Sequence, residues 1–122
     1  ADVLLHAIIE SIIGALGLGD IGKHFPDTDP RYAGADSMLL LKEVVRLVRN
    51  EGYQVGNLDA TILCQRPKLA GFIAAMRENI AACCEIPVSD VSVKATTEEK
   101  LGFTGSGAGI AVHAVALLEH ID

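Results

Sequence analysis

The chain has 122 residues, which suit one domain, and a domain of this size buries about two-thirds of the surface that its unfolded chain exposes. Hydrophobic residues make up 50% of the chain and aromatic residues only 4%, so the core is expected to consist of Leu, Ile, Val and Ala. The net charge of −6, without a basic cluster, argues against a nucleic-acid partner, and no apolar stretch reaches the roughly 18 residues of a membrane span.

The mean hydropathy of +0.36 is high for a monomer outside a membrane, and it predicts apolar surface hidden in a subunit interface. The three cysteines, Cys64, Cys83 and Cys84, lack C-x-x-C spacing, which indicates a reducing compartment rather than a disulfide framework or a zinc knuckle. The chain starts at Ala1 without Met and without a secretory leader pattern, so we expect a cut upstream end.

A first helix is predicted by apolar residues at helical spacing, namely Leu4, Leu5, Ile8, Ile9, Ile12, Ile13 and Leu16. It should end at the glycines of residues 17–19. After a polar loop, Asp36 and Ser37 can cap a second helix, which should stop at Gly52 with Arg46 and Arg49 near its end.

Residues 53–64 read as a strand with Leu58, Ala60, Ile62 and Cys64 on one face. A third helix is predicted over residues 69–84 and a short strand over residues 91–96. The apolar run 110–118 predicts a last strand that is buried on both faces. This order indicates an α+β two-layer sandwich, with a mixed or antiparallel sheet and helices on one face.

Two polar segments, residues 20–29 and 94–103, combine glycine, hydroxyl groups, a lysine and carboxylates. Backbone amides, hydroxyls and carboxylates together can hold a phosphorylated ligand and a divalent cation, so a phosphate site is the leading hypothesis. The alternative is a pair of ordinary capped loops, because Asp, Thr, Gly and Pro also form turns.

Asp2, His6 and Glu10 follow each other at helical spacing and therefore share one face of the first helix. They fit a zinc-ligating imidazole with acidic neighbours, or a solvent-exposed helix edge with a weakly paired histidine. The remaining histidines are weaker candidates: His24 in the polar loop, His113 in the last strand and His120 near the C-terminus. Residues 105–109 fit neither a nucleophile elbow nor a P-loop.

The chain contains, in order, the strings Asp2-Val-Leu-Leu-His6, Gly19-Asp-Ile-Gly22, Phe25-Pro-Asp-Thr-Asp29, Gly56-Asn-Leu-Asp59, Gln65-Arg-Pro-Lys68 and Lys94-Ala-Thr-Thr-Glu-Glu-Lys-Leu-Gly-Phe-Thr-Gly105. Together they resemble the 2-C-methyl-D-erythritol 2,4-cyclodiphosphate synthase family of the non-mevalonate isoprenoid pathway. The resemblance covers the whole chain, and it implies a single synthase-like domain over residues 1–122 that lacks the family's N-terminal segment.

The resemblance implies a phosphorus-oxygen lyase acting on 4-diphosphocytidyl-2-C-methyl-D-erythritol 2-phosphate. The 2-phosphate would attack the β-phosphorus and expel CMP, so positioning and charge neutralisation would replace an enzyme nucleophile. The resemblance further implies that His6 is one of three protein zinc ligands and that Glu99 holds Mg²⁺ or Mn²⁺. It assigns catalytic roles to Asp27, Thr97 and Glu99.

The substrate-binding residues that the resemblance implies fall into three groups. Near the ribose and the methylerythritol phosphate they are Asp20, Ile21, Gly22, Phe25, Pro26, Asp27, Thr28 and Asp29. The cytosine pocket would be formed by Cys64, Gln65, Arg66, Pro67, Lys68, Leu69 and Ala70. The third group, which includes the diphosphate contacts, comprises Ala95, Thr96, Thr97 and Phe103. The family also implies a homotrimer with active sites between subunits, in bacterial cytoplasm or plastid stroma.

The chain departs from the family pattern at both ends. An Asp-x-His pair and a His-Ser-Asp string that precede the first helix in the family are missing here, so the other zinc ligands are expected upstream. Ser106 and Ala108 replace a charged Arg and Glu that the family associates with an isoprenoid diphosphate in the trimer's central cavity. The alternative hypothesis is therefore a truncated or non-catalytic trimeric scaffold that retains only nucleotide binding.

Overall fold

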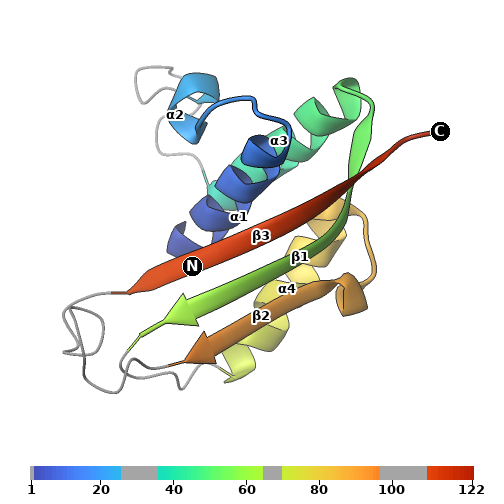
Figure 1. Cartoon of the computed structure of the whole chain (residues 1–122). Helices are drawn as coiled ribbons and strands as arrows, with labels where there is room; N and C mark the ends of the chain where they lie inside the picture. Colours follow the sequence, from blue (N-terminus) through green and yellow to red (C-terminus); the bar gives the residue numbers. More distant parts are fainter. Residues whose placement is uncertain (1, 26–35, 65–69, 97–109) are drawn as a thin grey trace.

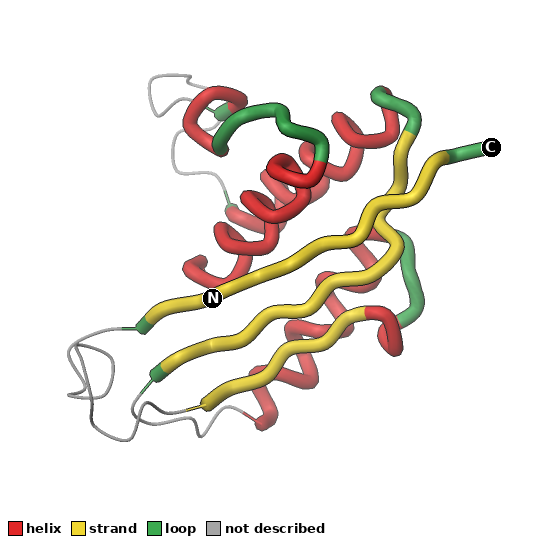
Figure 2. The backbone as a smooth tube through the Cα atoms, in the orientation of Figure 1, coloured by secondary structure: helices red, strands yellow, loops and turns green. Residues whose placement is uncertain are grey.

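The computed structural model describes residues 2–25, 36–64, 70–96 and 110–122, omitting the side chain of Asp2. The helices are α1 (Asp2–Ala15), α2 (Ile21–His24), α3 (Ser37–Asn50), α4 (Ala70–Cys84) and the 3-10 helix η1 (Val88–Asp90), and the strands are β1 (Tyr53–Leu63), β2 (Val91–Thr96) and β3 (Ala111–His120). Figures 1 and 2 show α1, α3 and α4 behind the sheet, which confirms a two-layer α+β arrangement with helices on one face.

The three-stranded sheet has the order β2-β1-β3 and is mixed, as expected. β1 is parallel to β2 and antiparallel to β3, and α4 lies in the connection that a parallel pair requires. The register with β3 shifts between Val55 and Asn57. Gly56 occupies this bulge, and a Cβ there would lie 2.8 Å from Oε1 of Glu119. A side chain at position 56 would therefore displace Glu119.

The core lies between the sheet and the helices, and its residues follow the predicted periodicities. In α1 the fully buried residues are Ile8, Ile9, Ile12 and Ile13, and in α3 they are Leu41, Val44 and Val48. The predicted inner face of β1 is confirmed, because Leu58, Ala60, Ile62 and Cys64 are all buried. The three cysteines are free thiols, and burial raises the pKa of Cys84 to about 12, so that this thiol stays neutral.

Helix ends follow the predicted capping residues. The carboxylate of Asp36 accepts a 2.9 Å hydrogen bond from the Met38 amide, which satisfies one of the free N–H groups at the start of α3. α3 ends at Asn50, and Gly52 follows with a φ of +88°, a conformation that glycine adopts without steric strain. The chain thereby reverses into β1.

Two expectations need correction. The last strand was expected to be buried on both faces, but Val115 is 70% and Leu117 58% exposed. The alternate residues Val112, Ala114, Ala116 and Leu118 pack against the core, because helices cover only one face of the sheet in a single chain. His24, expected in a loop, is the last residue of α2.

Within the described ranges, no helix is both long and apolar enough to cross a membrane.

Candidate functional site

One edge of the sheet brings several predicted site residues together. The parallel strands β1 and β2 end at this edge, where the Cys64 amide donates a 3.1 Å hydrogen bond to the Thr96 carbonyl. Ala111 pairs with Leu63, so β3 begins at the same edge. The chain therefore enters residues 65–69 and 97–109 from neighbouring points, and these ranges contain the predicted cytosine and diphosphate contacts.

The side chains at this edge differ in how accessible they are to a ligand. The Cys64 side chain belongs to the core, so its backbone is what remains for a ligand. Ala95 is half-buried, whereas Thr96 and Ala70 are exposed. Polar contact with a ligand from the described part of this edge would therefore come from backbone groups and from the Thr96 hydroxyl.

The predicted metal ligand His6 lies on the exposed face of α1, beside the first residues of β3, the strand that begins at the edge described above. Its side chain is 58% exposed, and its Nε2 lies 3.6 Å from Oε1 of Glu10, one helical turn away. This separation is too long for a hydrogen bond but is within the range of an ion pair. An open hollow of about 650 Å³ lies here, lined by His6, Glu10 and Ser11 from α1 and by Val112, His113 and Ala114 from β3.

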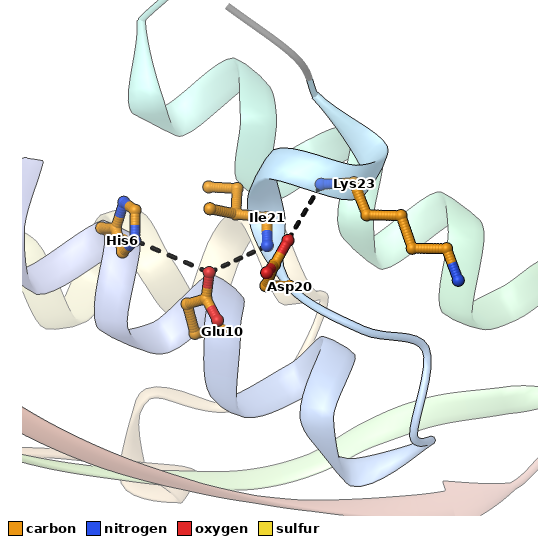
Figure 3. A network of polar contacts seen from close by, with 5 residues as sticks. All are labelled: His6, Glu10, Asp20, Ile21 and Lys23. Carbon is orange, nitrogen blue, oxygen red and sulfur yellow. Dashed lines mark hydrogen bonds and ion pairs between the residues drawn. The ribbon is translucent and has the colours of Figure 1, made fainter.

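Glu10 also connects α1 to the predicted ribose-binding segment. Its Oε1 accepts a 2.8 Å hydrogen bond from the Ile21 amide, at the start of α2 (Figure 3). The adjacent Asp20 caps the same helix, because its Oδ1 accepts a 3.0 Å hydrogen bond from the Lys23 amide. The structure thus brings His6 and residues 20–22 together through a residue absent from the predicted site. The sequence signal that could have included Glu10 in the site was its i, i+4 spacing from His6.

Two further contacts fix the chain around α2. The His24 ring nitrogen Nε2 lies 2.7 Å from the Leu18 carbonyl oxygen, and the Phe25 side chain packs partly against the core. Gly19 has a φ of +96°, and a Cβ there would lie 2.9 Å from Cδ of Lys23. Glycine at this position allows the chain to turn tightly into Asp20.

The described residues form no complete metal site. Among ranges 2–25, 36–64, 70–96 and 110–122, no group of three or more His, Cys, Asp and Glu side chains is arranged to hold a metal ion. His6 and Glu10 supply one imidazole and one carboxylate, which fits a single contributed ligand and an acidic neighbour rather than a complete site.

The other predicted site residues are not described by the structure. Outside the described ranges lie Pro26, Asp27, Thr28, Asp29, Gln65, Arg66, Pro67, Lys68, Leu69, Thr97, Glu99 and Phe103. The catalytic roles expected for Asp27, Thr97 and Glu99 therefore stay predictions.

Comparison with known proteins now identifies the family. Residues 1–119 match the sequence model of the YgbB family. The 2-C-methyl-D-erythritol 2,4-cyclodiphosphate synthase of Trichlorobacter lovleyi is 66% identical over 118 residues, covering 97% of this chain and 75% of its own. The corresponding synthase of Pseudomonas entomophila is 62% identical over 117 residues, covering 96% of this chain and 74% of its own.

Solved structures agree with the sequence relatives. The bifunctional IspDF of Campylobacter jejuni superposes with a TM-score of 0.91 at 44% identity, covering 98% of this chain and 32% of its own. A CDP complex of IspF from Plasmodium falciparum has a TM-score of 0.84 at 33% identity, covering 98% of this chain and 72% of its own. The fold and the length of the match agree. The chain therefore belongs to the 2-C-methyl-D-erythritol 2,4-cyclodiphosphate synthase family.

Proposed function

We propose that this chain converts 4-diphosphocytidyl-2-C-methyl-D-erythritol 2-phosphate to 2-C-methyl-D-erythritol 2,4-cyclodiphosphate and CMP. An oxygen of the 2-phosphate forms a bond to the β-phosphorus, and the bond from that phosphorus to the oxygen of the departing CMP breaks. The supporting observation is the 66% identity to a synthase over 97% of the chain. The alternative of a non-catalytic scaffold gains no support from the relatives, which are themselves named as synthases.

The nucleotide half of the substrate would be held by two described parts of the chain. The edge formed by Cys64, Thr96 and Ala70 leads into the predicted cytosine and diphosphate contacts, and Asp20 and Gly22 would meet the ribose. Asp20 uses Oδ1 to cap α2. A carboxylate has two acceptor oxygens, so capping orients the group while leaving acceptor capacity for a ribose hydroxyl. The CDP complex of the Plasmodium falciparum relative supports a nucleotide ligand.

His6 would contribute one ligand to a zinc ion, and Glu99 would hold Mg²⁺ or Mn²⁺. An exposed imidazole that lines a hollow and has a carboxylate neighbour fits the first role. When bound, such cations act as Lewis acids on phosphate oxygens. The Glu10 carboxylate, 3.6 Å from the ring nitrogen Nε2, would orient the His6 imidazole. Thr96 and Thr97 would donate hydrogen bonds to the diphosphate.

The chain would act as one domain in a homotrimer whose active sites lie between subunits. The supporting feature is the outer face of β3, where Val115 and Leu117 stay exposed on a single chain. Large exposed apolar side chains in a row on one strand are typical of a surface that another chain covers.

A CMP-release assay on the full-length natural chain tests the proposed reaction. Chelators should abolish CMP release, and Glu99→Gln should lower turnover on the order of 100-fold, because it removes a charge that would hold a cation at the phosphates. Glu78→Gln, which changes an exposed carboxylate on α4, serves as the control and should leave the rate unchanged. An unchanged Glu99→Gln rate at limiting magnesium would contradict the second-metal role, and a full-length protein that releases no CMP would contradict the reaction.

A further inference from the structure

Glu10 is the point at which two separate elements of the candidate site meet. Its single oxygen Oε1 accepts a 2.8 Å hydrogen bond from the Ile21 amide and lies 3.6 Å from the Nε2 atom of His6 (Figure 3). His6 and Glu10 belong to α1, whereas Ile21 begins α2. One carboxylate therefore contacts both the proposed metal ligand and the segment proposed to bind the ribose.

The helix α2 depends on such contacts for its position. It has four residues, and an isolated helix of that length is not stable in water. The first amides of a helix also lack partners within the helix, and the Ile21 amide finds its partner in Glu10 rather than in a nearby turn residue. Loss of this acceptor would leave a half-buried N–H group unpaired and would release the start of α2 from α1.

We propose that Glu10 is a positioning residue that couples cation binding at His6 to nucleotide binding at residues 20–22; this rests on the proposed function, which places those ligands there. A cation bound to the His6 ring places positive charge beside the Glu10 carboxylate and restrains it. The restrained carboxylate in turn holds the Ile21 amide, and with it the backbone that Asp20 and Gly22 present to the nucleotide. Coupling of this kind is reciprocal, so CMP must strengthen zinc binding by the same factor.

The experiment measures CMP affinity by calorimetry on the full-length natural chain, without zinc and with saturating zinc. In the unaltered protein, zinc should tighten CMP binding roughly fivefold or more, a common size for coupling between two sites. Glu10→Ala should reduce this factor to less than about twofold. Glu10→Gln keeps an oxygen that can accept from Ile21, so its zinc-free CMP affinity should stay unchanged while the zinc effect shrinks, because a neutral amide attracts the ring less.

A second measurement follows the contact itself. Hydrogen exchange at the Ile21 amide should accelerate in Glu10→Ala and stay slow in Glu10→Gln. Glu43→Gln is the matched control, because Glu43 is also a partly exposed helical carboxylate with an ion pair one turn away, to Arg46 on α3. It should leave both the coupling factor and the exchange rate unchanged. If Glu10→Ala fails to fold, Glu10→Gln still carries the affinity test.

The outcomes separate this proposal from the proposed function. A protein that binds zinc and CMP independently, or a Glu10→Gln variant with the full coupling factor, would overturn the role of Glu10 and leave the reaction untouched. A protein that binds CMP neither with nor without zinc would instead overturn the proposed function and this inference with it. Coupling that disappears only in the two Glu10 variants would support the proposal.

Discussion

Among the described carboxyl groups, that of Asp59 has a pKa that the fold lowers, and the neighbouring residues explain why. It lies on the outer face of β1, where Lys94 of β2 donates a hydrogen bond to its Oδ1. This hydrogen bond lowers the pKa of Asp59 below the ordinary value of 3.8, and slight burial opposes the shift while Ser92 adds to it. The pair joins the parallel strands two residues before Thr96, at the edge that enters the proposed diphosphate segment.

The lowered pKa gives a pH-dependent prediction. A carboxyl with a depressed folded pKa stabilises the fold at every pH above its unfolded value near 3.8, and this contribution is lost as pH falls through the folded value. Asp59→Asn should therefore lower the free energy of unfolding at pH 7 by no more than about 1 kcal/mol, because both side chains are half-exposed.

Urea titrations of the two proteins across the acid range check this expectation. The stability gap between Asp59→Asn and the unaltered chain should narrow as pH drops below 3.8. Glu43→Gln, which removes the negative charge from the exposed ion pair with Arg46, provides the comparison variant for these titrations. A gap that widens on acidification would show that the ion pair does not account for the effect.

At the scale of elements, Arg77 links α4 to the start of β2 through hydrogen bonds. Its Nε donates a 2.6 Å hydrogen bond to the Val91 carbonyl and its terminal nitrogen donates a 3.0 Å hydrogen bond to the Val88 carbonyl. Val91 is fully buried, so its carbonyl has poor access to water if Arg77 is removed. The guanidinium thus orders the strand that ends at Thr96.

Arg77→Met should therefore destabilise the fold by about 1–3 kcal/mol, because it leaves two carbonyls without these donors while keeping an apolar stem of similar length. The measurement is the urea midpoint at neutral pH. Arg46→Met, on the exposed surface of α3, should change the stability by less than about 0.5 kcal/mol. Equal losses of stability in the two variants would contradict the proposed contribution of the Arg77 hydrogen bonds.

The elements that the sequence predicted well are those in which periodicity alone decides burial. The spacing of Ile8, Ile9, Ile12 and Ile13 specifies α1, and the residues 91–96 predicted as a strand are β2. The short helix α2 was missed because its four residues are too few to show a helical period, and its start is held not only by the Asp20 cap but also by Glu10, eleven residues earlier in the chain. Such a contact depends on how two elements pack, and no local pattern encodes it.

The last strand and the candidate site could also be predicted only in part from the sequence. Residues 110–118 are almost uniformly apolar, so the sequence could not separate a strand with one covered face from one with two. The stripe of His6 and Glu10 was visible from spacing, but its connection to Ile21 was not. The roles of Asp27, Thr97 and Glu99 came from the resemblance to the family and stay predictions.

At the scale of the whole molecule, assembly is the property that the exposed face of β3 predicts. Sedimentation velocity on the full-length natural chain should give a trimer, because Val115 and Leu117 offer an apolar surface that water contacts unfavourably. Val115→Glu should shift the protein towards monomers, since it places a charge in the proposed interface.

Leu39→Glu is the matched control for assembly. Leu39 is also a large exposed apolar residue, at 55%, but it lies on α3, in the layer on the other side of the sheet. Its substitution should leave the trimer intact. A stable monomer at micromolar concentration that binds no hydrophobic dye would contradict the proposed assembly.

The strand order has a consequence for how the molecule is made. β1 is central and pairs with β3, which follows every other described element in the chain, and α1 packs against that same strand. During synthesis, the side of α1 that packs against β3 therefore stays uncovered by this strand until residues up to His120 have left the ribosome. The hollow beside His6 gains its second wall only then. A nascent chain halted before β3 would present the His6 imidazole without the residues of β3 that line this hollow.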